Sequence, residues 1–531
     1  MNIEKFSIQK LSLFRPLRLF ITIVLLIGLF FRFYNLDYKV YWDDEVYTSL
    51  RVAGFTETEV VKEFSSNQIS QVSDIQKYLH FSSNKNVTDT IMALAKEEPQ
   101  HPPLYFIMSY YWVKIFGYSI GGIRSLSAVA SLLSLPAIYW LCMELFGYST
   151  FGYVAMVILA VSPFHVLYSQ EAREYSLWTL MILLMSASFL RAVRLKGTFN
   201  WAGYTGLLTL GLYIYPLSGF VAIGHGLYLI VLQGFRLKKI VISYLISVSL
   251  GFLIFSPWLL VTFLNTNQIG KGMSFIRYYS LSPLDIFKVL IGSVKFVFID
   301  ESLHSPALIG SILILVGYSI YYLYRKTPIR VWLFLATLSL FAVIPTVIPD
   351  LMDRGGRTTQ YRYLISLYLA IELALVYLLA SQISSTSTRL WLKRFWQSIL
   401  VAVVSMGIVS CIISSQAETA WIKLGPSGSF PSLARIINQT PHSLIISDNY
   451  IAYSAALSYR LDPRVSLNLA PRCYLCTLPT PSLINPKLLQ IPDDFRNIFL
   501  LLPSRQLKDE FEKTHKLTQV DKSEFLWQVQ R

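Results

Sequence analysis

Three carboxylates stand next to one another near the start of the chain, at Asp43, Asp44 and Glu45. Like charges this close raise the pKa of at least one member, which suits a general base that takes a proton from a hydroxyl. Carboxylate oxygens also bind divalent cations, so the same cluster could hold a metal ion. The alternative interpretation, which stays open on these residues alone, is the solvated start of a loop.

A histidine follows in the run His101-Pro102-Pro103. Proline suits the first turn of a helix, so the two prolines predict that a helix begins here with His101 at its mouth. A lone histidine is more often structural. His101, however, ends the same polar segment that the acidic cluster begins, which favours a place in a site.

Two further ionic segments interrupt apolar sequence, at 169–175 and 353–363. In the first, Arg173 either pairs with a neighbouring glutamate as an ionic knot or lines a site. The second holds Arg354, Arg357 and Arg362. Guanidinium groups bind phosphate oxygens in bidentate fashion, so these arginines suit a phosphate clamp. The alternative is contact with lipid headgroups.

Membrane helices are expected to position these motifs. The chain has 531 residues, of which 54% are hydrophobic and only 15% are charged. This composition excludes a soluble enzyme, a disordered chain, a fibrous repeat and a disulfide scaffold. A helix needs about 20 apolar residues to cross a bilayer. The segments predicted to cross lie near 17–34, 122–146, 150–168, 174–193, 201–217, 219–234, 240–263, 305–323, 331–348, 362–380 and 396–416.

Basic clusters in the short loops set the predicted orientation. The net charge of +15 would suggest nucleic acid in a soluble protein. Here clusters of Lys and Arg lie between apolar segments, at 191–196, 236–239, 325–330 and 389–394. Because such clusters resist translocation, we predict that these loops are cytoplasmic and that nucleic acid is not a partner. Segment 103–117 is short and carries Lys114, so it is expected to lie in the outer interface.

The predicted fold is an all-α polytopic membrane protein with about 11 transmembrane helices, an interfacial juxtamembrane helix and a small C-terminal α/β domain. We expect a transmembrane domain over 1–416, with the first external loop and the juxtamembrane helix at 35–121, and an extracytoplasmic domain over 417–531. The N-terminus would be cytoplasmic. An alternative with about 12 or 13 spans would recruit part of 281–299 and move basic loops outward.

Two cysteines and one glutamate need separate interpretation. Cys473 and Cys476 form a Cys-x-x-Cys in the expected external domain. Outside the cytosol two such thiols can oxidise to a disulfide. A redox centre or half of a zinc site are the alternatives, although no second Cys or His pair accompanies them. Glu372 lies inside a predicted span, and we interpret it as a protonated or internally paired structural residue.

The order of these motifs resembles that of the GT-C membrane glycosyltransferases. The likeness rests on the Asp-Glu pair after the first span, the His-Pro-Pro-Leu helix start, the Ser-Gln-Glu-Ala-Arg-x-Tyr loop and the Arg-Tyr-Leu start of a late span. Within this group the chain is similar to the dolichyl-phosphate-mannose–protein mannosyltransferase-like and the aminoarabinose and galacturonic acid lipid A transferase-like enzymes. The resemblance covers about residues 15–380.

This resemblance implies a GT-C fold and an enzyme of the cell envelope. The reaction would move a monosaccharide from a polyprenyl-phosphate donor to a lipid, glycan or protein acceptor at the outer face of the membrane. Asp44 would deprotonate the acceptor hydroxyl, with Glu45 in support. Lipid A transferases carry Lys where this chain has His101. The residues expected to line the substrate site are Asp43, His101, Gln170, Glu171, Arg173, Tyr175, Arg354, Arg357 and Arg362. Relatives differ in their need for a divalent metal, so metal and cofactor stay open.

The alternative function is a polytopic transporter or flippase for a lipid-linked glycan. Such a protein would carry several charged residues inside the membrane and inverted repeats. The sequence has one intramembrane glutamate and no evident repeat. The enzyme hypothesis instead requires carboxylates on the outer side of the membrane, where the acidic cluster is predicted to lie.

Overall fold

The computed structural model describes residues 15–65, 68–274, 276, 279–386, 388–420, 425–476, 494–520 and 522–530. Residues 1–14, with which the predicted membrane domain begins, lie outside the described residues. The chain divides into two compact units, and each is described by itself. The first unit comprises residues 1–36, 124–259 and 274–416, and the second comprises 37–123, 260–273 and 417–531.

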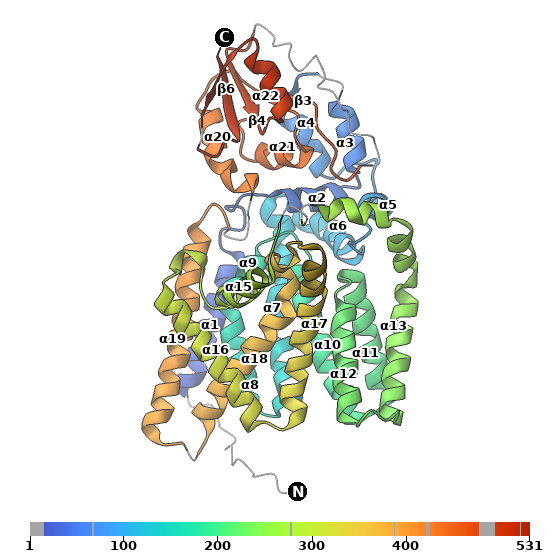
Figure 1. Ribbon diagram of the computed structural model, residues 1–531, viewed down its shortest axis with the longest axis vertical. Helices are drawn as coiled ribbons and strands as arrows, with labels where there is room; N and C mark the ends of the chain where they lie inside the picture. The colour runs from blue at the N-terminus through green and yellow to red at the C-terminus, as the bar shows by residue number, and fades with distance from the viewer. Residues whose placement is uncertain are drawn as a thin grey trace. The chain divides into compact units, whose positions relative to one another are not determined.

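The first unit is made of helices, and the long ones run roughly alongside one another in Figure 1. They are α1 (Arg15–Phe33), α7 (Ile120–Phe146), α8 (Ser149–Ala160), α9 (Pro163–Ser169), α10 (Tyr175–Leu195), α11 (Thr198–Ile214), α12 (Ser218–Leu232), α13 (Lys239–Leu264), α15 (Pro283–Ser293), α16 (Pro306–Lys326), α17 (Ile329–Asp353), α18 (Ile365–Ser384) and α19 (Leu390–Gln416). The 3-10 helices are η3 (Val294–Val297), η4 (Glu301–Leu303), η5 (Arg357–Thr359) and η6 (Tyr361–Leu364). Every segment predicted to cross the membrane contains a helix.

Not all of these helices are long and apolar enough to cross a bilayer by themselves. Among the described residues seven are, or eight if α8 and α9 form one bent span. The chain is therefore a multi-pass integral membrane protein. Helix α1 contains three arginines among its 19 residues. Helices α11 and α12 have only 17 and 15 residues, fewer than the roughly 20 that a crossing needs. The number of crossings, predicted as about eleven, stays a prediction.

Burial separates inner from outer helices in the first unit. Helices α10 and α18 are buried over 83% of their most apolar stretch, whereas α16 is buried over 22%. A helix that is hydrophobic all round and largely buried forms the centre of a bundle. The exposed apolar side chains of α13 and α16, such as Leu253 and Ile314, suit contact with lipid.

The predicted span at 150–168 is broken into α8 and α9, which meet at an angle of 62°. A helix end leaves carbonyl oxygens without an intrahelical partner. Arg32 of α1 donates to two of them, the carbonyls of Leu159 (3.1 Å) and Ala160 (2.6 Å). Its Nε donates to Ser131 Oγ (2.9 Å), and the side chain is fully buried. Arg32 therefore supplies hydrogen-bond donors to the carbonyl oxygens that the break between α8 and α9 leaves without an intrahelical partner.

The second unit combines helices of the first loop with a sheet. Its helices are α2 (Asp43–Val52), α3 (Glu57–Phe64), α4 (Val72–Gln76), α5 (Val87–Glu97), α6 (Leu104–Phe116), α14 (Thr266–Gly272), α20 (Phe430–Asn438), α21 (Ile451–Ser458) and α22 (Arg505–Glu512), with 3-10 helices η1 (Lys77–Leu79) and η7 (Pro426–Ser429). Helix α6 begins directly after Pro102 and Pro103, as predicted. It is 13 residues long, and Lys114 lies in its last turn.

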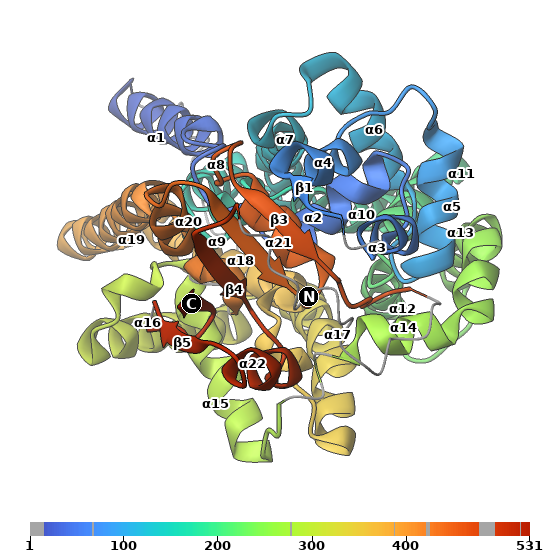
Figure 2. The same cartoon turned by 90° about the horizontal axis from the view of Figure 1, so that it is seen from above.

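The sheet has six strands in the order β1-β3-β2-β4-β6-β5. They are β1 (Ser70–Gln71), β2 (Ser443–Ser447), β3 (Ser466–Leu469), β4 (Asn497–Leu501), β5 (Lys516–Gln519) and β6 (Leu526–Gln530). The inner strands β3, β2 and β4 are parallel and the outer pairings are antiparallel. Figure 2 shows β3 and β4 from above, with α22 near the end of β4. The small α/β fold predicted for the C-terminal segment is confirmed.

Alternating residues of the strands build the core of the sheet. Leu444 and Ile446 of β2 and Ile498 and Leu500 of β4 pack with α22 on one face. No sequence pattern predicts β1, in which Ser70 of the first loop pairs with Leu467 of β3. Backbone hydrogen bonds thus join the first loop to the C-terminal segment. The predicted domain boundary after residue 416 stays a prediction.

The role of Arg32 can be tested by Arg32→Met. We expect the change to lower the free energy of unfolding by about 3 kcal/mol or more, because buried carbonyl oxygens would lose their donor. Thermal unfolding in detergent measures the effect. Arg18→Met, at an exposed position of the same helix, is the matched control and should change stability by about 0.5 kcal/mol or less. Equal effects of the two changes would contradict the assignment.

Candidate functional site

The acidic cluster forms the first turn of α2 in the second unit. Carboxylates are favoured at a helix N-terminus because the backbone N–H groups there are unpaired and the helix dipole is positive. Asp43 accepts a hydrogen bond from Ser427 Oγ (3.1 Å), at the start of the C-terminal segment. Glu45 is fully buried and lies 3.5 Å from the backbone N–H of Trp42. Asp44 is half-buried and lies between them in sequence.

His101 lies in the same unit, in the turn between α5 and α6. Its backbone N–H donates to the carbonyl of Glu98 (2.9 Å), and its half-buried ring meets Phe106 edge-on at 6.3 Å. Helix α2 packs against both α5 and α6. The structure therefore brings the helix that carries Asp44 and the corner that carries His101 together within one unit.

The remaining predicted residues belong to the first unit, where Arg173 and Arg362 meet on one aromatic ring. Both guanidinium groups lie over Tyr175, at 5.8 and 5.4 Å from its centroid. A guanidinium is attracted to the face of an aromatic ring. Arg173 also forms an ion pair with Glu174, with Nε and Oε2 3.5 Å apart. Two arginines from loops far apart in sequence thus gather at the start of α10, and their role in binding phosphate stays a prediction.

Gln170 has a contact that sequence reasoning missed. Its side-chain amide donates to the carbonyls of Phe31 (2.7 Å) and Tyr34 (2.9 Å), at the C-terminal end of α1. These carbonyls are unpaired at a helix end, so the glutamine caps α1. Glu171 beside it is buried in the same loop. The predicted contact of Gln170 with substrate stays a prediction beside this structural contact.

The other two arginines of the predicted clamp differ in their surroundings. Arg354 is exposed and ends α17 in a left-handed conformation with φ of 55°. Arg357 donates to Asp350 (3.1 Å) and to both carboxylate oxygens of Asp353 (2.8 and 2.7 Å). The hydrogen bonds with Asp353 raise the pKa of the Arg357 guanidinium, and burial opposes them. Arg357 is therefore engaged in the fold of its own loop.

Asp350 organises this loop. Its fully buried carboxylate accepts from the Arg357 backbone N–H (2.9 Å) and from both the N–H and the hydroxyl of Thr358 (2.8 Å each). Hydrogen bonds to a charged acceptor are stronger than those between neutral groups. Asp350 thereby determines how the loop leaves α17 and approaches Arg362.

A buried contact with a histidine explains how Glu372 is accommodated inside the bundle. Its Oε2 lies 3.2 Å from Nε2 of His165, and both side chains are almost fully buried between α9 and α18. The interpretation of Glu372 as an internally paired residue is confirmed. His165 carried no motif in the sequence, because its partner is far away along the chain.

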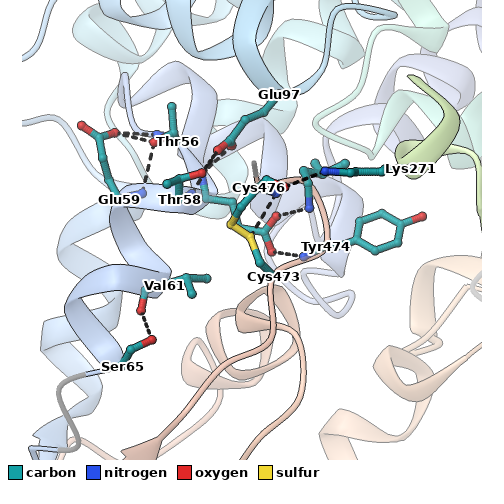
Figure 3. The surroundings of a disulfide bond; sticks show 12 residues. Thr56, Thr58, Glu59, Val61, Ser65, Glu97, Lys271, Cys473, Tyr474 and Cys476 are labelled. Atoms are coloured by element: carbon teal, nitrogen blue, oxygen red, sulfur yellow. Dashed lines mark hydrogen bonds between the residues drawn. A yellow bond between two sulfur atoms is a disulfide. The ribbon is translucent and has the colours of Figure 1, made fainter. Parts of the chain in front are cut away.

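Cys473 and Cys476 form a disulfide with Cα atoms 5.4 Å apart (Figure 3). Together with Glu57 they form the group of His, Cys, Asp or Glu side chains that could hold a metal in the described part of the chain, with ligand atoms within 4.8 Å. Paired sulfurs are not thiolates, and thiolate is the form that binds metal. The disulfide interpretation is confirmed, and a metal at the acidic cluster stays untested.

Comparison with known proteins identifies the fold. Residues 100–261 match the family described as dolichyl-phosphate-mannose-protein mannosyltransferase. The structure resembles ArnT from Cupriavidus metallidurans, solved with undecaprenyl phosphate, with a TM-score of 0.52 and 12% identity over 97% of this chain and 98% of that one. It also resembles the oligosaccharyltransferase AglB from Archaeoglobus fulgidus, solved with an inhibitory peptide and a dolichol-phosphate. That TM-score is 0.51, with 12% identity over 91% of this chain and 69% of that one.

These proteins are GT-C glycosyltransferases, so the chain has the GT-C fold. The resemblance predicted from the motifs is confirmed. No curated protein matches the chain in sequence. The likeness to the solved structures therefore lies in the arrangement of helices, at an identity where few side chains are shared.

The loop at 353–362 provides a test of this geometry. In Asp350→Asn the new side chain has one acceptor oxygen, so we expect the loop to open more often. Amide exchange at Arg357 and Thr358 should become about 10- to 100-fold faster, which corresponds to the loss of about 1.5–3 kcal/mol. Asp353→Asn is the matched control, because Asp353 is exposed and its ion pair contributes little. Unchanged exchange in Asp350→Asn would contradict the role of Asp350.

Proposed function

We propose that the chain is a membrane glycosyltransferase that moves a monosaccharide from a polyprenyl-phosphate donor to a lipid, glycan or protein acceptor. The observation that carries the proposal is the GT-C fold shared over nearly the whole length with ArnT, which was solved with undecaprenyl phosphate bound. The matched mannosyltransferase family and the dolichol-phosphate in AglB support the same donor class. Polyprenyl phosphate would be the carrier that the reaction releases.

The reaction breaks the bond between the anomeric carbon and the phosphate oxygen of the donor. Asp44 takes the proton of the acceptor hydroxyl, and the acceptor oxygen forms the new bond to the anomeric carbon. The half-buried carboxylate at the N-terminus of α2 suits this role. Glu45 supports it from its buried position. Attack opposite the leaving phosphate inverts the anomeric centre.

The phosphate that leaves carries a growing negative charge, which cations stabilise. Arg173 and Arg362 are proposed to supply them, because their guanidinium groups gather on Tyr175. His101 is proposed to line the donor-phosphate side, and Arg354 is an exposed cation of the same loop as Arg362. Asp43, Gln170, Glu171 and Arg357 stay proposed lining residues. Metal dependence is not part of the proposal.

The proposed topology has about 11 crossings with the N-terminus in the cytoplasm and the reaction at the outer face. A helix at every predicted span supports it, as does the short α6 with its single lysine. The C-terminal α/β segment is then extracytoplasmic. A disulfide between Cys473 and Cys476 suits that compartment.

The catalytic assignment is tested by Asp44→Asn in purified protein with lipid and a panel of polyprenyl-phosphate sugars. We expect the transfer rate to fall about 100- to 10,000-fold, because an amide cannot accept the proton. Asp89→Asn is the matched control, since Asp89 also lies in the first turn of a helix of this unit. Full transfer by Asp44→Asn would refute the assignment. Movement of a lipid-linked glycan without transfer would favour a flippase.

The topology is tested by single cysteines and a thiol reagent that does not cross membranes. Ile115→Cys should be labelled from outside, and Phe235→Cys only from the cytoplasmic side. Both positions are exposed, at 74% and 76%. Background is low because Cys142 and Cys411 are buried and the other two cysteines are paired. Labelling of Ile115→Cys from the cytoplasmic side would overturn the proposed topology.

A further inference from the structure

Arg51 is a fully buried arginine on α2, the helix that begins with the acidic cluster. It lies about two turns after Asp44. Its Nε contacts Glu98 Oε2 at 2.6 Å and its Nη2 contacts Glu97 Oε2 at 2.9 Å. Its Nη1 donates to the carbonyl of Phe55 (3.0 Å). One guanidinium thus joins α2 to two neighbouring carboxylates through the fork that only arginine offers.

The two carboxylates belong to the corner that carries His101. Glu97 ends α5 and Glu98 follows it. The carbonyl of Glu98 accepts the backbone N–H of His101 at 2.9 Å. Arg51 therefore connects the helix of Asp44 with the turn of His101 by one short ion pair and one backbone hydrogen bond.

Glu97 extends the connection to α3. Its carboxylate accepts the backbone N–H groups of Glu57 (2.6 Å) and Thr58 (3.0 Å) and the Thr58 hydroxyl (2.5 Å). These are the first two residues of α3, where N–H groups lack intrahelical partners. Three helices, α2, α3 and α5, are thus joined around Arg51. Figure 3 shows the hydrogen bonds between Glu97 and Thr58 near the disulfide.

The loop that carries the disulfide, residues 473–476, binds Glu57 at the start of α3. The carboxylate of Glu57 accepts the backbone N–H groups of Tyr474 (3.1 Å) and Leu475 (2.6 Å). Burial raises the pKa of Glu57 to about 7, although these hydrogen bonds oppose the shift. Lys271 Nζ donates to the carbonyl of Cys476 at 3.0 Å (Figure 3). The loop at 473–476 therefore holds Glu57, and with it the start of α3, in place.

A gain in stability alone is a weak explanation for the buried ion pairs of Arg51 with Glu97 and Glu98. Burying an ion pair costs desolvation energy, and apolar side chains of similar volume are often as stabilising. Burial lowers the pKa of Arg51, and the ion pairs with Glu98 and Glu97 more than restore it, so the group stays charged. These ion pairs instead fix orientation, because charged hydrogen bonds of defined geometry determine where α2 lies relative to α5.

We propose that Arg51 is a positioning residue that holds Asp44 in its catalytic geometry relative to His101. The inference rests on the proposed function. It assigns no contact of Arg51 with substrate, because the side chain is buried among its carboxylates and carbonyl. Displacement of a catalytic group by about 1 Å can cost about 100-fold in rate. Loosening of α2 should therefore lower kcat more than it changes binding.

The test uses Glu98→Gln and Arg51→Lys in the full-length protein. Glu98→Gln keeps the volume and leaves Arg51 balanced by Glu97, while Arg51→Lys keeps the charge but loses the fork. In both we expect kcat to fall about 10- to 100-fold, with the KM for the donor within about twofold of the original. Amide exchange in the first turn of α2 should become faster in both variants.

Lys513→Met is the matched control. It removes a 2.5 Å ion pair with Glu510 at the end of α22, in the same unit. We expect it to leave kcat and the exchange of α2 unchanged. If all three variants lose kcat only in proportion to thermal stability, the role of Arg51 is structural and the inference is wrong.

Amide exchange also separates this inference from the proposed function. If the protein transfers no sugar at all, the proposed function fails, and faster exchange of α2 would still show that Arg51 anchors the helix. If Asp44→Asn abolishes transfer while Glu98→Gln and Arg51→Lys keep full kcat, the proposed function stands and the positioning role is refuted.

Discussion

Burial of guanidinium groups is the constraint on which much of this structure depends. Arginine does not give up its charge in proteins, so in apolar surroundings it must find carboxylates, carbonyls or aromatic faces. Arg32 finds carbonyls where a membrane helix breaks. Arg51 finds two carboxylates where three helices of the second unit meet. Each of these contacts joins segments that are distant in sequence, so each determines local geometry as well as local charge.

The same constraint distinguishes the arginines of the predicted phosphate clamp. Arg357 is paired with Asp350 and Asp353, and the buried Asp350 organises its loop. Arg173 and Arg362 lie over the ring of Tyr175. The ring thus brings two cations together, which is the arrangement that the proposed role at an anionic leaving group requires.

Sequence patterns anticipated the helical framework well. Long apolar segments predict helices because backbone groups in a bilayer must be satisfied within the segment, and the structure has a helix in each. The start of α6 after two prolines, the small C-terminal α/β fold and the disulfide were also anticipated. The pairing of β1 with β3 was not, because a two-residue strand carries no periodicity. The capping contact of Gln170 likewise depends on where α1 ends in space.

By itself, the sequence determined the class of protein, the helices and the residue types that could do chemistry. Hydropathy, proline positions and clustered charges are local properties, and they act within a few turns of the chain. The tertiary structure alone decided which of those residues are engaged: Arg357 with Asp350, Gln170 with α1, Arg173 and Arg362 with Tyr175, and Arg51 with the corner of His101. The physical reason is that a buried charge is satisfied by whatever group the fold brings within about 3 Å, and no local pattern specifies that group.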